Sequence, residues 1–179
     1  MATRPPLDDA APRGRRPASP NASTTRRGDP GAVLMERPGV LIRRLHQVHS
    51  AMFQEECAAF GVTPVQYSLL TLLAHMPGME QGIAAAGLRL DRFTTADVVR
   101  RLEAAGLLLA KRGQDRRAKI LFLTRRGTEV FAAMQACVAR AHDRLVEPLP
   151  ERRRAPFLRL LRQLVDHHSA IGDSPPKVR

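Results

Sequence analysis

Apolar side chains recur at three- and four-residue spacing between residues 92 and 105, which predicts an amphipathic helix with one buried face. The apolar positions are Thr95 (through its methyl group), Val98, Val99, Leu102 and Ala105. Asp91 precedes this helix, and its carboxylate suits the free N–H groups of a first helical turn. Gly106 follows the last apolar position and is typical of the residue that ends a helix.

On both sides of this helix the pattern predicts further short elements. A short alanine-rich helix is expected over residues 81–88, after a short strand at 79–81. Residues 107–112 and 119–124 have strand-like composition and are joined by a turn. The order helix, turn, helix, two-stranded ribbon predicts a helix-turn-helix with a wing, which places its second helix in the major groove of DNA.

Longer amphipathic helices flank this unit. They are expected over about 38–60, 64–76, 125–145 and 151–169, with prolines at or near several of the boundaries. Together these helices carry more apolar surface than one small winged domain can bury. The sequence therefore predicts a homodimer.

Both ends of the chain lack apolar periodicity. Residues 1–31 are rich in Pro, Ala, Ser, Thr and Arg and are expected to form a disordered basic tail, either a loose arm on DNA or a solvated segment. Residues 172–179 are expected to form a flexible tail. The predicted domain spans 32–171, with a DNA-binding lobe over about 62–125 and dimerisation helices over about 38–60 and 125–170.

Composition narrows the class of partner. Lys and Arg number 29 against 17 Asp and Glu, a net charge of +12, which favours an anionic partner such as nucleic acid. The absence of a long apolar run or signal peptide, and two cysteines without metal-like spacing, indicate a reduced cytoplasmic protein that makes no membrane contact. Six Phe, one Tyr and no Trp argue against a single-strand binder that stacks bases on aromatic platforms.

Three motifs resemble the MarR (multiple antibiotic resistance regulator) family of transcription factors. They are the wing pattern Asp115-x-Arg117 followed by Leu123-Thr124, the helix from Leu90-Asp91-Arg92 to Gly106-Leu107, and Thr63-Pro64-x-Gln66-Tyr67. The resemblance covers about residues 38–171. It implies an all-α fold with a small β-wing, dimerisation through the first and last two helices, and repression of a palindromic operator that is relieved by a small, often phenolic or carboxylic compound.

Ten residues are candidates for DNA contact. On the helix, arginines suit guanine edges or phosphates, a threonine suits several edges, and Phe93 can touch a thymine methyl group. Asp97 is repelled by phosphates unless it accepts from cytosine or pairs with Arg101, which is itself expected to be a solvated helix charge. On the wing, cations can enter the minor groove and the aspartate can hold the turn. The full set is Arg92, Phe93, Thr94, Asp97, Arg100, Arg112, Asp115, Arg116, Arg117 and Lys119.

A second apolar stripe on the first long helix contains two histidines one turn apart. It suggests a crevice with a few polar groups that fix an acid or phenol; the alternative is a pair of half-buried interface histidines. The segment 41–47 resembles family members tied to aromatic-acid breakdown, including CoA thioesters. The expected effector-binding residues are Arg43, Arg44, His46, His49, Phe53 and Tyr67.

The sequence leaves other functions open. A redox sensor would use Cys57 or Cys137, but Glu55 and Glu56 disfavour a thiolate at Cys57. A metal sensor would need the two histidines to converge with His142 or carboxylates. An architectural DNA binder without an effector is the non-regulatory alternative. The chain shows no nucleophile–base pair, phosphate-binding glycine loop or metal motif, so neither an enzyme nor a cofactor is expected.

Overall fold

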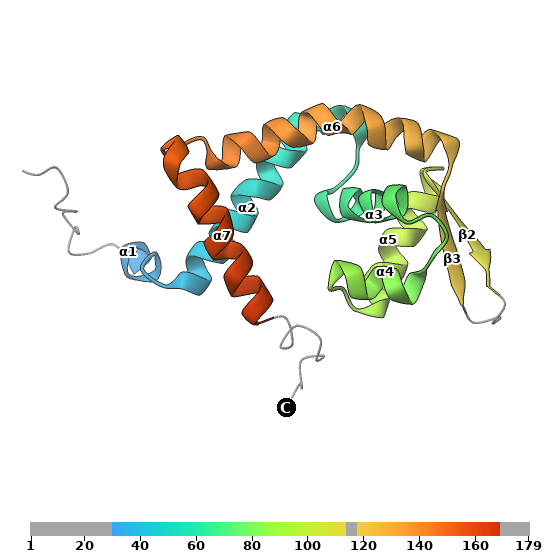
Figure 1. Ribbon diagram of the computed structural model, residues 1–179, viewed down its shortest axis with the longest axis horizontal. Coiled ribbons are helices and arrows are strands. Elements are labelled where there is room, and N and C mark those ends of the chain that lie inside the picture. Colours follow the sequence, from blue (N-terminus) through green and yellow to red (C-terminus); the bar gives the residue numbers. More distant parts are fainter. Residues whose placement is uncertain (1–29, 114–117, 169–179) are drawn as a thin grey trace, which may run out of the picture.

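The computed structural model describes residues 30–113 and 118–168, and it shows the expected all-α fold with a small sheet. Figure 1 shows α6 running along the top of the molecule and joining two parts, a helical arm formed with α2 and α7 and a compact lobe that contains α3, α4, α5 and the strands. The elements are α1 (Pro30–Leu34), α2 (Pro38–Glu56), η1 (Ala58–Phe60), α3 (Pro64–His75), β1 (Met79–Glu80), α4 (Gln81–Leu88), α5 (Arg92–Ala104), β2 (Leu108–Arg112), β3 (Lys119–Leu123), α6 (Arg125–Val146) and α7 (Glu151–His167).

The sheet is antiparallel with the strand order β1-β3-β2, so the expected short strand before α4 is present and pairs with β3. In the wing, Leu108 pairs with Leu123 and Arg112 pairs with Lys119. The N–H of Gly113 donates to the carbonyl oxygen of Ala118 at 2.9 Å, which holds the two strands together at the start of the turn.

The core of the lobe forms where the apolar faces of α3, α5 and β3 meet. Its fully buried members include Leu69 and Leu73 of α3, Val99 and Leu102 of α5, and Leu121 of β3. Thr95 is also fully buried, and its hydroxyl donates to the carbonyl oxygen of Asp91 at 2.9 Å, which satisfies the polar group inside the core. The buried face predicted for α5 is confirmed except at Ala105, which is exposed.

The base of the wing is locked to the start of α6. Thr124 caps α6 by accepting the N–H of Gly127 at 2.9 Å, and its hydroxyl donates to the carbonyl oxygen of Gly106 at 2.7 Å. Gly127 is buried against the backbone of Leu107, where a Cβ atom would overlap the Leu107 carbonyl group. This contact fixes the direction in which the ribbon leaves the lobe.

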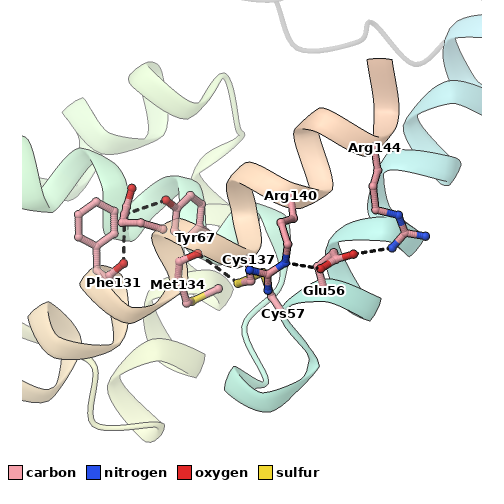
Figure 2. The surroundings of a disulfide bond; sticks show 9 residues. Glu56, Cys57, Tyr67, Phe131, Met134, Cys137, Arg140 and Arg144 are labelled. Atoms are coloured by element: carbon pink, nitrogen blue, oxygen red, sulfur yellow. Dashed lines mark hydrogen bonds and ion pairs between the residues drawn. A yellow bond between two sulfur atoms is a disulfide. The ribbon is translucent and has the colours of Figure 1, made fainter. Parts of the chain in front are cut away.

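Side chains from the end of α2 and the middle of α6 form a continuous seam, which Figure 2 shows. Glu56 accepts hydrogen bonds from Arg140 at 2.9 Å and Arg144 at 2.7 Å. Hydrogen bonds from these two arginines hold the pKa of Glu56 below its usual value. The next residue, Cys57, is joined to Cys137 by a disulfide, and both cysteines are buried.

The disulfide corrects the expectation of two reduced cysteines. The sequence separation of 80 residues gave no sign that the two would meet, because the pairing depends on how α2 packs against α6. Their Cα atoms lie 5.5 Å apart, a usual separation for bridged residues.

Three helix boundaries differ from the sequence prediction. α1 begins at Pro30, so the last two residues of the predicted tail are helical, while residues 1–29 lie outside the described part of the chain. α2 ends at Glu56, before the short η1 helix and a left-handed Gly61 (φ 62°), because the chain must turn toward α3. α7 ends at His167.

The arm leaves apolar surface uncovered within a single chain. No side chain of α7 is buried, and Leu160, Leu164 and Val165 are more than half exposed. Ile42 of α2 is exposed as well. An apolar helix face of this kind needs a covering partner.

Candidate DNA-binding surface and effector pocket

α5, the helix predicted to enter the major groove of DNA, presents three faces that follow from its 3.6-residue period. One face is buried in the lobe. A second, with Arg92 and Ala96, faces the wing. The third points outward and carries Phe93, Asp97 and Arg100 at helical spacing.

On the outward face, Asp97 forms ion pairs with both Arg100 and Arg101. The hydrogen bond from Arg100 is the main cause that lowers the pKa of Asp97, followed in the same direction by the bond from Arg101 and opposed by desolvation. The expected pairing of Asp97 with Arg101 is therefore observed. The additional bond to Arg100 was not expected, and it occupies a guanidinium group that the sequence assigned to DNA.

The start of α5 is organised by Asp91 and Thr94. The Asp91 carboxylate accepts two hydrogen bonds from Thr94, one from its backbone N–H at 2.8 Å and one from its side-chain hydroxyl at 2.5 Å. These two bonds hold the pKa of Asp91 below its usual value. Since the Thr94 hydroxyl donates its proton to the cap, it is left as an acceptor toward any base edge.

A groove of about 420 Å³ separates α5 from the wing and includes two of the predicted DNA contacts, Arg92 and Lys119. The groove also includes the first residues of α4. Arg112, a third predicted DNA contact, pairs with Lys119 in the wing ladder. Asp115, Arg116 and Arg117, at the wing tip, lie outside the described residues and remain sequence predictions.

Phe93 has the most exposed of the large apolar side chains in the described residues, with an exposed fraction of 86%. It lies on the outward face, one helical turn before Asp97.

A second cavity, also of about 420 Å³, lies where the arm meets the lobe. Three of the predicted effector residues, His49, Phe53 and Tyr67, line it together. The remaining lining residues come from α3, α4 and α6, and they are Pro64, Ser68, Thr71, Leu72, Gly87, Leu88 and His142.

Aromatic and imidazole rings form one wall of this cavity. The rings of His49 and His142 stack with their centroids 5.4 Å apart, and the rings of Phe53 and Tyr67 are 5.9 Å apart. Burial lowers the pKa of His49, and the nearby imidazoles of His142 and His46 lower it further. Both effects favour the neutral form of His49.

Tyr67 is held by residues on α6. Its hydroxyl oxygen accepts a hydrogen bond from Gln135 at 3.0 Å, and its ring stacks on Phe131 at 5.7 Å (Figure 2). The hydroxyl proton remains available to an acceptor in the cavity.

Three predicted effector residues do not line the cavity. Arg43 and Arg44 are exposed on other faces of α2, and Arg44 donates to Gln47 at 3.4 Å. His46 shares the face of His49 but lies one turn farther from the lobe. His142, which the sequence suggested only as a metal partner, takes a place in the cavity instead, because α6 returns antiparallel beside α2.

Two further sequence expectations concern metal binding and membrane-spanning helices. Within residues 30–113 and 118–168, no group of three or more His, Cys, Asp and Glu side chains is arranged to hold a metal ion. In those same ranges every helix is too short or too polar to cross a bilayer.

Comparison with known proteins agrees with this architecture, although no family model matches the chain. The HTH-type transcriptional repressor NicR from Pseudomonas putida is 30% identical over 139 residues, which cover 76% of this chain and 87% of NicR. The PcaV transcriptional regulator from Streptomyces coelicolor is 34% identical, with a TM-score of 0.65 over 75% of this chain and 98% of PcaV, and a second PcaV structure holds its natural ligand.

Two more solved structures concern the two candidate sites. The transcriptional repressor CouR, bound to a 23-mer DNA duplex, is 33% identical with a TM-score of 0.69 over 74% of this chain and 94% of CouR. BpsR from Bordetella bronchiseptica, whose DNA binding is regulated by 6-hydroxynicotinic acid, is 26% identical with a TM-score of 0.68 over 73% of this chain and 95% of BpsR. With a winged helix-turn-helix lobe, a helical arm and relatives at this level of identity, the chain belongs to the MarR family of transcriptional regulators.

Proposed function

We propose that the protein is a homodimeric repressor that binds a palindromic operator and releases it when a small aromatic carboxylic acid, or a related CoA thioester, occupies the cavity at His49, Phe53, Tyr67 and His142. The observation that carries this proposal is the position of the cavity. Its lining residues come from the arm and from the two helices that support the recognition helix.

The cavity is placed to connect ligand binding with DNA binding. His49 belongs to α2 and His142 to α6, whereas Gly87 and Leu88 belong to α4, which packs against α5. A ligand wedged between these elements changes how the lobe sits on the arm. In a dimer that change alters the spacing of two recognition helices, which must match successive major grooves about 34 Å apart.

The cavity walls fit a flat aromatic acid. The rings of Phe53 and Tyr67 offer apolar faces, and the imidazoles and the Tyr67 hydroxyl offer donors to a carboxylate or phenol oxygen. The ligand complex of PcaV and the regulation of BpsR by 6-hydroxynicotinic acid support this ligand class.

The uncovered face of α7 supports the dimer. Leu158, Leu160, Leu164 and Val165 are exposed in one chain, and a second copy of the same arm would cover them. Pairing through the arm leaves both lobes free to reach DNA.

The proposal is tested by fluorescence anisotropy on a duplex that the protein enriches from a random-sequence library. Benzoates, hydroxycinnamates and their CoA thioesters are titrated into the complex. A ligand shifts the equilibrium only by its difference in affinity for the two states, so an effector raises the apparent Kd for DNA while inert acids leave it unchanged. If no member of the panel changes the Kd, the aromatic effector is rejected.

Two variants locate the ligand. Tyr67→Phe removes one hydroxyl without changing the cavity shape, so more acid should be needed for release. Arg43→Gln, on an exposed face of α2, should leave the release curve unchanged. The reverse result would place the acid near Arg43 and outside the cavity.

The disulfide favours a second candidate, a redox-responsive regulator of the same fold, because Cys57 and Cys137 join the arm beside Phe53. Comparing the DNA affinity of oxidised and reduced protein tests it. Equal affinities reject redox control.

A further inference from the structure

The outward face of α5 begins with an apolar side chain that the fold leaves bare. Phe93 is 86% exposed, whereas Thr95, Val98, Val99 and Leu102 of the same helix are buried. Residues 92–94 form the first turn of α5, the part of a recognition helix that reaches the base edges most directly.

Several polar side chains near Phe93 are bonded to one another. Thr94 donates its hydroxyl proton to Asp91, and Asp97 engages both Arg100 and Arg101. The first turn therefore presents an exposed aromatic ring on its outward side. One turn later, the charged side chains are paired with one another. The start of the helix is thus suited to an apolar contact more than to reading hydrogen-bond donors and acceptors.

The surroundings of Phe93 point to DNA as the surface that covers it. Arg92, the residue before Phe93, lines the groove between α5 and the wing together with Lys119 and one carboxylate, Glu80. Arg112 pairs with Lys119 in the wing ladder, so basic residues outnumber acidic ones on the wing side of this first turn. Phosphates attract these cations and draw the ring toward the floor of the major groove. There the apolar feature that distinguishes one base from the others is the C5-methyl group of thymine.

We infer that Phe93 contacts the C5-methyl group of a thymine in each half-site and so makes thymine a specificity-determining base of the operator. This inference rests on the proposed DNA-binding function. An alternative use of an apolar side chain is as a wedge that unstacks a base step, but such wedges act from the minor groove, whereas α5 is the major-groove helix of this fold.

The test is a double-mutant cycle between protein and DNA. The duplex that the full-length protein enriches from a random library is synthesised with each thymine in turn replaced by deoxyuridine, which removes only the methyl group. For the wild-type protein, one such replacement in a half-site should weaken binding about fourfold, and replacement in both half-sites about sixteenfold. Other replacements should have no effect.

Phe93→Ala should bind the thymine and deoxyuridine duplexes equally, because the partner of the methyl group is gone. Met76→Ala, which removes an exposed apolar side chain at the end of α3, should keep the wild-type ratio. Circular dichroism at matched concentration shows whether each variant is folded.

The results that would overturn this inference differ from those that would overturn the proposed function. Failure to enrich any duplex rejects DNA recognition itself. A wild-type protein that binds all deoxyuridine duplexes as tightly as thymine duplexes overturns the methyl contact, and so does an enriched site without thymine. A Phe93→Ala variant that retains the fourfold ratio assigns the methyl contact to another residue and also overturns the inference.

Discussion

Breaking the Cys57–Cys137 disulfide should cost a large part of the protein's stability. The bridge joins the end of α2 to the middle of α6 across a sequence separation of 80 residues. In the chain-entropy account, closing a loop of that length removes about 4.5 kcal/mol of unfolded-state entropy at 25 °C. Since domains are typically stable by about 5–15 kcal/mol, the reduced protein should be close to marginal.

The assay is urea unfolding at one fixed protomer concentration, with and without a phosphine reductant, followed by circular dichroism. With a slope of about 2 kcal/mol per molar urea, reduction should lower the midpoint by roughly 2 M. The matched control is the Cys57→Ala/Cys137→Ala double variant. Its midpoint should be lower from the start and should not respond to reductant.

Thiol counting decides whether the premise holds. Protein purified without reductant and unfolded in denaturant should release no reactive thiol, because the structure pairs both cysteines. Two reactive thiols per chain would show that the cysteines are reduced, as the sequence suggested. Equal midpoints with and without reductant would show that the bridge does not stabilise the fold.

The remaining predictions concern stability at single sites. Gly127→Ala should lower the free energy of unfolding by about 3 kcal/mol or more, since its methyl group would overlap the Leu107 carbonyl, while Gly39→Ala, with open space around it, should be neutral in the same denaturation series. The pKa of His49 lies below its usual 6.5, so its contribution to the free energy of unfolding is present above pH 6.5 and lost as the pH falls. The melting temperature should therefore fall less steeply from pH 8 to pH 5 for His49→Gln than for wild type. Asp91→Ala should lower the melting temperature at pH 7. The pKa of Asp91 lies below its usual 3.8, so the difference between variant and wild type should shrink in acid as the wild-type carboxyl group protonates. A difference that is unchanged at pH 2 contradicts the capping role.

Local patterns predicted the lobe well because its elements are defined by short-range rules. The buried face of α5, its Asp91 cap and the glycine after its end all follow from spacing within one helix. The short strand before α4 was also predictable, since residues 79–81 lie between a Pro-Gly turn and a helix.

The features that could not be predicted from the sequence depend on packing between distant segments. His142 reaches the cavity, and Cys137 reaches Cys57, only because α6 runs back along α2. Arg43 and Arg44 were assigned to the effector by charge, but helical phase turns them away from it. Asp97 was correctly paired with Arg101, whereas its bond to Arg100 required side-chain conformations that spacing alone does not determine.

In the proposed mechanism, two copies of the lobe bind two symmetric half-sites and leave them when an aromatic acid fills the cavity. Hydroxyl-radical footprinting on the enriched duplex tests this most directly, with and without the acid that is most active in the anisotropy panel. We expect protected tracts related by two-fold symmetry, with centres about one helical turn apart, and loss of all of them when the acid is added. Continuous, asymmetric protection that the acid leaves unchanged would rule out this mechanism and indicate an architectural DNA-binding protein.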